Sequence, residues 1–222
     1  MKNLRFITAA GILCFAIFHS AVAVGQKKVS ELTLVYDYSV GDAGSKAPGA
    51  ENVTHTVYIK GTKSRSEMTN PLFSSTTIFD SGTGFGVILN EVSGQKLLIR
   101  LNPENWKEKN KPYAGMVYKN TTETKEIAGY KCIKAIGQTQ SGATITVFYT
   151  RDLVPDNRDY DPAFKTLEGL PLEYEFASGD LKIRYRVVRI NINPVPASKF
   201  DIPKSGYREM NYEESKKMNV GN

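Results

Sequence analysis

Hydrophobic and polar residues alternate along most of the chain from Val29 onward. This period of two is typical of β-strands that bury one face. In the first such stretch, every second position is apolar or aromatic, and polar residues occupy most of the positions between. The residues expected on the apolar face are Leu32, Leu34, Tyr36, Tyr38 and Val40. The pattern predicts a strand with one face turned toward a core.

Further short runs of strand character follow, separated by turn residues such as SGTG and VSGQ. They cover residues 53–60, 64–69, 75–80, 85–90, 96–101, 113–118, 122–128, 130–138, 143–150, 169–177 and 180–192. Many short strands at nearly regular spacing predict an antiparallel sheet. Helix signals are confined to 103–108, where Pro103 favours a start, and 209–218. We therefore expect a mainly β fold: a strongly curved antiparallel sheet, an open or half barrel, with one or two short helices.

One hairpin can be placed in register from its side chains. If Ser178-Gly179 forms a two-residue loop, apolar residues face each other on one side of the pair and opposite charges on the other. The expected pairs are Phe176 with Leu181, Tyr174 with Ile183, Glu175 with Lys182 and Glu173 with Arg184. Beyond Val187-Val188 the alternation changes phase, which predicts a β-bulge.

The first 23 residues have the layout of a secretory signal peptide. Lys2 and Arg5 precede an apolar run from Phe6 to Phe18, and Ala21-Val22-Ala23 offers a small-residue cleavage site. The alternative is an uncleaved anchor, but the run is shorter than the roughly 20 residues that span a bilayer. We expect residues 1–23 to be removed, 24–210 to form a single β-rich domain, and 211–222 to be a C-terminal tail. The protein would then be periplasmic or extracellular, with no transmembrane segment left.

Net charge does not indicate a nucleic-acid-binding protein. The formal charge is +6, and acidic and basic residues alternate along the chain. A basic stripe interleaved with aromatic residues, which nucleic-acid binding requires, is missing from the sequence. We expect no nucleic-acid partner.

Signal cleavage would leave Cys132 and His55 as the single cysteine and the single histidine. A structural zinc site needs about four such ligands, so we expect neither a metal nor another cofactor. A Cys–His nucleophilic pair is the alternative, because such partners meet in space and not in sequence. However, Cys132 lies in the alternating run GYKCIKA, which favours a buried structural thiol. His55 shares a face with Val57 and Ile59, which predicts a core or edge histidine with a satisfied ring nitrogen.

An acidic stretch at 151–164 offers a second candidate metal site. Asp152, Asp156, Asp159 and Asp161 supply oxygen ligands of the kind that calcium prefers. The order of an EF-hand loop is absent, since no glycine stands at the required turn. A turn-rich loop is the competing interpretation.

Four stretches carry a resemblance to a known family: EIAGYKCIKA, FYTRDL, LEGLPLEYEF and FDIPKSGY. Over roughly residues 120–210 the chain resembles exported bacterial envelope proteins of domain-of-unknown-function family 4412, which have a LolA-like lipoprotein-carrier fold. It is more distantly similar to exported proteins named for a GLPGLI motif, which here reads Gly169-Leu-Pro-Leu-Glu-Tyr174. The resemblance implies a curved sheet whose concave face can hold something apolar. It carries over no catalytic residue.

Two functions fit these observations, and neither is an enzyme. The first is an exported envelope module that binds a lipid or other apolar ligand, such as an acyl chain, in the concave face of the sheet. The residues expected to contact the ligand are Leu34, Tyr36, Tyr38, Tyr174, Phe176 and Tyr185. The long connection at 41–52 is the candidate lid. The alternative is a non-catalytic envelope interaction protein that binds a protein or glycan partner.

Overall fold

The structure is a computed structural model that describes residues 25–41, 53–178 and 181–218. The predicted signal peptide and all but the first residue of the predicted lid at 41–52 lie outside the described residues, and both stay predictions. Within the described ranges, no helix has the length and apolar character that a bilayer crossing requires.

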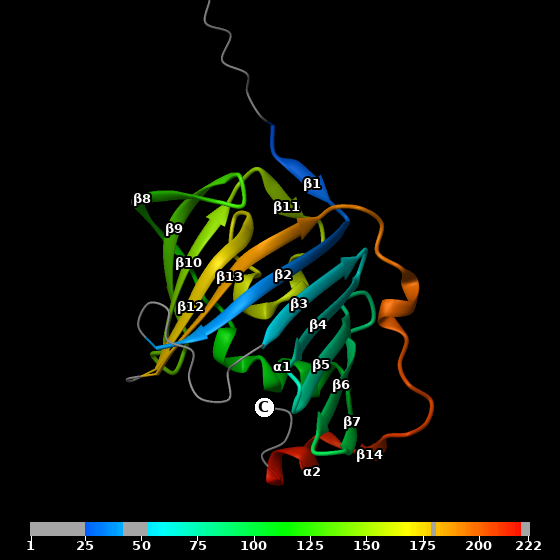
Figure 1. The fold of residues 1–222 in the computed structure, drawn as a ribbon. Helices are drawn as coiled ribbons and strands as arrows, with labels where there is room; N and C mark the ends of the chain where they lie inside the picture. Colours follow the sequence, from blue (N-terminus) through cyan, green and yellow to red (C-terminus); the bar gives the residue numbers. More distant parts are fainter. Residues whose placement is uncertain (1–24, 42–52, 179–180, 219–222) are drawn as a thin grey trace, which may run out of the picture.

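One large sheet dominates the fold (Figure 1). Its strands in chain order are β2 (Glu31–Val40), β3 (Thr54–Lys60), β4 (Lys63–Thr69), β5 (Phe73–Asp80), β6 (Phe85–Val92), β7 (Gln95–Leu101), β8 (Lys119–Ile127), β9 (Tyr130–Gln138), β10 (Thr144–Thr150), β12 (Leu170–Ser178), β13 (Leu181–Asn191) and β14 (Arg208–Met210). Their spatial order is β14-β7-β6-β5-β4-β3-β2-β13-β12-β10-β9-β8. All neighbours are antiparallel except β14 and β7.

The sheet is strongly curved, as predicted. Figure 1 shows the strand direction turning progressively, so that β8–β10 and β5–β7 form opposite ends of the curved surface. Tyr160 and Phe164, from the short helical turns η2 (Arg158–Tyr160) and η3 (Pro162–Phe164), belong to the main core, and the Phe164 ring packs on Tyr174 of β12. Two smaller apolar clusters lie on the two faces of β5–β7.

The alternation in β2 corresponds to one buried face of the strand, as predicted. Leu32, Leu34 and Tyr36 are buried, whereas the residues between them are only partly buried. The same strand pairs Tyr36 with His55 on β3. The period-two pattern therefore places this face of the strand in the core.

Both predicted helices are present, with α1 at Pro103–Lys109 and α2 at Tyr212–Lys217. In α1 the Asn102 side chain accepts a hydrogen bond from the Asn105 backbone N–H, and Pro103 occupies the first turn, where its missing donor costs nothing. In α2 the Asn211 side chain caps the helix in the same way, and Tyr212 is buried. The C-terminal segment expected as a tail thus packs on the sheet as far as this helix.

The prediction of a strand at 113–118 is wrong. Residues Lys111–Tyr113 form the 3-10 turn η1, and the next strand, β8, begins only at Lys119. Pro112 lacks a backbone donor, and Gly115 adopts a φ of +69°, which does not fit an extended strand. Met116 is buried without belonging to a strand, so its apolar character reflects a loop that packs on the core.

The predicted β12–β13 register is also wrong, by two residues. Glu175 lies opposite Arg184, Glu173 opposite Arg186 and Tyr174 opposite Tyr185, and Ser178 pairs with Leu181. A shift of two residues keeps every side chain on the same face of the sheet. Both registers therefore place apolar residues opposite each other and opposite charges opposite each other. The bulge predicted in β13 is confirmed, because the pairing with β2 slips between Val187 and Arg189.

Three short strands were not predicted from the sequence. β1 (Lys27–Val29) pairs in parallel with β11 (Leu153–Pro155), and β14 pairs in parallel with β7. Three residues are too few to show a period, and parallel pairing joins segments far apart in sequence.

Candidate functional site

The six residues predicted to bind a ligand lie together on one face of β2, β12 and β13. Their rings pack against each other: the ring centroids of Tyr174 and Tyr185 are 4.8 Å apart, and those of Tyr38 and Tyr185 are 5.3 Å apart. Leu34, Tyr36 and Tyr174 are buried, while Tyr38 and Phe176 are partly exposed. The cluster therefore forms part of the core, with two aromatic rings at its margin.

His55 is a buried histidine with satisfied ring nitrogens, as predicted, and it packs against this cluster. Its Nε2 lies 2.9 Å from the Ser66 hydroxyl, and its Nδ1 lies 3.2 Å from the Tyr174 hydroxyl. Its ring stacks on Tyr36, with centroids 5.3 Å apart. Burial lowers the pKa of the imidazole to about 4, so the ring is neutral at physiological pH.

Asp161 stands close to the same cluster, between η2 and η3. Its Oδ1 accepts a hydrogen bond from the Ala163 backbone N–H, and desolvation raises the pKa of its carboxyl to about 6. The Tyr36 hydroxyl donates to the Pro171 carbonyl, whereas the buried Tyr160 hydroxyl has no hydrogen-bond partner within the described residues. The interior of the curved sheet is thus aromatic with a few buried polar groups.

Cys132 is a buried free thiol on β9, as predicted. Desolvation raises its pKa to about 11, which keeps the thiol protonated at neutral pH. Its Sγ lies 3.5 Å from the Tyr130 carbonyl oxygen, while both ring nitrogens of His55 are engaged elsewhere. The two residues do not form a nucleophile–base pair.

The acidic stretch folds as a turn-rich segment. Asp161 caps η3, Asn157 caps η2, and the Asp159 carboxylate pairs with Lys165 at 2.5 Å. Among the described residues, no group of three or more acidic, His or Cys side chains is placed to hold a metal ion.

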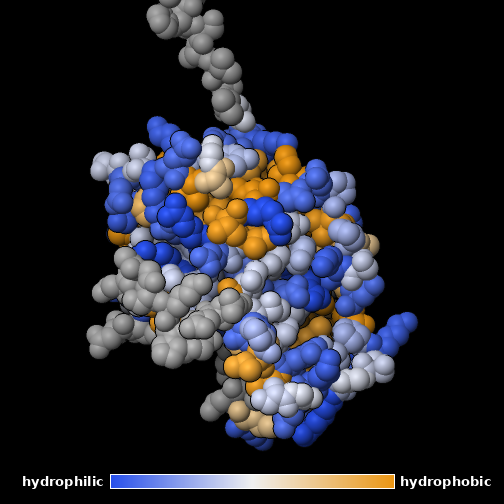
Figure 2. Space-filling model, viewed as in Figure 1, coloured by the Kyte–Doolittle hydropathy of each residue, from blue (hydrophilic) through white to orange (hydrophobic). Residues whose placement is uncertain are grey.

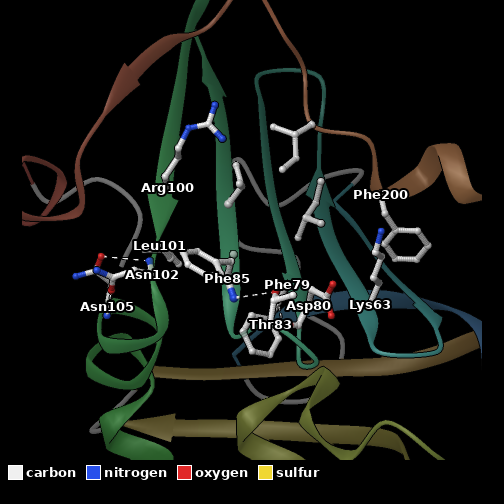
Figure 3. Close-up of a pocket in the computed structure, with 14 residues that line it drawn as sticks. Lys63, Phe79, Asp80, Thr83, Phe85, Arg100, Leu101, Asn102, Asn105 and Phe200 are labelled. Atoms are coloured by element: carbon white, nitrogen blue, oxygen red, sulfur yellow. Dashed lines mark hydrogen bonds between the residues drawn. The ribbon is translucent and has the colours of Figure 1, made fainter.

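A different region holds the main pocket, which sequence reasoning missed. The hollow of about 500 Å³ lies between one face of β5–β7 and the segment that runs from the turn η4 (Ala197–Phe200) toward β14. Figure 3 shows Phe85 in its middle, with Phe200 on one side and Arg100, Leu101 and Asn105 on the other. The apolar residues that line it are Ile78, Phe79, Phe85, Val87, Leu101, Phe200 and Ile202.

The walls of the pocket follow from strand pairing. Ile78 pairs with Val87, which places both on the same face, and Phe200 covers that face as part of a small apolar cluster. Phe85 is 59% exposed and Ile202 is 37% exposed. The hollow therefore has a packed apolar floor and an apolar rim that faces solvent.

A few polar groups stand at the edge of this pocket. Arg100 is held by Glu209, with 2.8 Å between Nη2 and Oε1, and the Asp80 Oδ1 accepts a hydrogen bond from the Gly82 N–H. Lys63 lies opposite Asp80 on the neighbouring strand. An apolar cleft of this size with a few polar groups is the usual form of a small-ligand site.

The pocket had one visible signal in the sequence. The run FGVIL at 85–89 breaks the period of two. Phe200 and Ile202 come from a segment without periodicity, so their position against β5–β7 could not be inferred.

No family model matches the sequence, and no curated protein matches it. Among solved structures, the chain is similar to PNGF-II at 16% identity and a TM-score of 0.55, covering 86% of this chain and 33% of that one. It thus spans about a third of the length of that protein. This likeness shows the fold alone, and the predicted membership of family 4412 stays a prediction.

Weaker similarity extends to two further proteins. They are MucB (11% identity, TM-score 0.42, covering 79% of this chain and 58% of that one) and the Mycobacterium tuberculosis lipoprotein LppX (11% identity, TM-score 0.34, covering 76% and 89%). TM-scores below 0.5 are too low to carry an argument about this chain.

Proposed function

We propose that this protein is a non-catalytic, exported binding module that holds an apolar ligand in the pocket between β5–β7 and the segment after η4. The observation that carries the proposal is a hollow of about 500 Å³ with an apolar floor and two exposed apolar residues, Phe85 and Ile202, at its rim. Rim residues such as Phe85 lose contact with water when a ligand binds, and burial of apolar surface is favourable by about 25 cal/mol per Å².

The pocket is a better candidate than the aromatic cluster because of its free volume. The rings of Tyr36, Tyr174 and Tyr185 already contact each other, so a ligand among them would have to displace packed side chains. A ligand in the pocket requires no such displacement.

Titration with a fatty acid that carries a dansyl group tests the proposal, since its fluorescence rises in apolar surroundings. We expect saturable binding to the wild type and a loss of about tenfold or more in affinity for Phe85→Ser. Leu72→Ser is the matched control, because Leu72 is 75% exposed and lies outside this pocket. Binding that is absent, or that both variants weaken equally, would overturn the proposal.

A further inference from the structure

The pocket continues into two further hollows along the same segment of the chain. Lys63 and Phe200 line both the pocket and a second hollow of about 430 Å³, which lies between η4 and the turn that joins β3 to β4. Ser30 and Glu31 line this second hollow and also a third of about 300 Å³, which reaches Ile192. In Figure 1 the segment after β13 runs along the outside of the sheet toward β14. Residues of this segment line all three hollows.

The groove changes character along its length. Half of the residues that line the pocket are apolar, whereas polar and charged residues such as Glu31, Lys60 and Thr62 line most of the second hollow. The residues that line the three hollows include five cations and two acids: Lys27, Lys28, Lys60, Lys63 and Arg100, with Glu31 and Asp80. The groove therefore joins a more apolar end to a more polar end, and each of its three hollows has one more cation than acid in its lining.

Most of the charges close to the pocket are already engaged within the chain. Lys60 pairs with Glu31 at 2.8 Å, and the other Glu31 oxygen accepts a hydrogen bond from the Val195 N–H. Arg100 is held by Glu209. In the described part of the chain, the Lys63 ammonium makes neither an ion pair nor a hydrogen bond, and it stands where the pocket meets the second hollow.

We infer that the ligand is an elongated amphiphile with an anionic head group, its chain in the Phe85 pocket and its head against the Lys63 ammonium. This inference rests on the proposed function and names the class of ligand. A carboxylate at this junction would gain a charge-assisted hydrogen bond, and Lys63 would gain the partner that it lacks. Asp80 lies directly opposite Lys63 on the neighbouring strand and lines the pocket but not the second hollow. Its repulsion therefore favours a head group on the side of Lys63 that faces the second hollow.

Isothermal titration with three ten-carbon probes tests the inference: decanoate, decanol and decyltrimethylammonium. We expect decanoate to bind most tightly. Lys63→Gln should weaken decanoate binding about tenfold and change decanol binding by less than about twofold, and Lys63→Arg should keep the preference for decanoate. Lys131→Gln, which removes an exposed lysine of β9 outside the groove, is the control and should change nothing.

Failure of the inference differs from failure of the proposed function. If decanoate and decanol bind equally, Lys63→Gln changes neither, and Phe85→Ser weakens both, the head-group assignment is wrong while the apolar site stands. If none of the three probes binds to the folded protein, the proposed function is wrong and the inference falls with it.

Discussion

Stability between pH 7 and pH 4 should depend on two groups that act in opposite directions, His55 and Asp161. The pKa of His55 falls from 6.5 to about 4 on folding because the imidazole is desolvated. Protonation therefore favours the unfolded chain, and stability is lost as the pH falls from 6.5 toward 4. At about 1.36 kcal/mol for each pKa unit, the loss from this fully buried ring amounts to about 3 kcal/mol.

Asp161 has the opposite sign. Desolvation raises its pKa from 3.8 to about 6, so protonation favours the folded chain. Its contribution to stability is present below pH 3.8 and is lost as the pH rises through 6. Because the residue keeps some exposed surface, solvent screening reduces the effect to about 1–2 kcal/mol. In the wild type the two effects offset each other over much of this range.

Single substitutions separate the two effects. Asp161→Asn removes the Asp161 effect and keeps the His55 effect, so the stability of this variant should fall by about 3 kcal/mol between pH 7 and pH 4. His55→Gln should remove that loss, and its stability should rise by about 1–2 kcal/mol over the same interval. Urea unfolding, followed by the fluorescence of the single tryptophan, Trp106, gives both quantities by linear extrapolation. The reasoning is refuted if both variants follow the pH dependence of the wild type, or if Asp161→Asn is the variant that gains stability in acid.

Three further predictions concern two single residues and one ion pair. Gly169→Ala should destabilise the protein by about 3 kcal/mol or more, because a Cβ there would lie 1.9 Å from the Thr150 carbonyl oxygen; an unchanged urea midpoint would contradict this clash. Cys132 in the native protein should react with a thiol reagent at pH 8 at least about a hundredfold more slowly than in urea, and equal rates would show that the thiol is accessible. Reversing the charges of Glu175 and Arg184 together should restore about 0.2–1 kcal/mol relative to the single reversals, as a double-mutant cycle measures; no coupling would argue against the observed register.

The sequence predicted the architecture because alternation is a strong local signal. The buried face of β2, the bulge in β13 and both helices follow from side-chain periods and caps that lie within a few residues of each other. The β12–β13 register could not be decided, because both pairings place Glu175 opposite a cation and Tyr174 opposite an apolar or aromatic residue.

The pocket was missed for a different reason. Tyr36 and Tyr174 were predicted as site residues because aromatic side chains on a strand face suit both a core and a binding surface. In the structure their rings contact each other. Phe200 and Ile202 line the same pocket as Phe85, although more than a hundred residues separate them in the sequence. The segment that contains Phe200 and Ile202 shows no hydrophobic period. Contacts of that kind are set by the path of the chain, which local patterns do not encode.

The most direct test of the account is a titration of isotope-labelled protein with decanoate, followed by backbone amide chemical shifts. We predict that the largest shifts fall on Phe85, Val87, Phe200 and Ile202, with Lys63 among them, and that they saturate together. Shifts that instead concentrate on Tyr38, Phe176 and Tyr185 would place the ligand in the concave aromatic face. Either that result or no saturable shift at all would contradict the pocket between β5–β7 and η4 as the binding site.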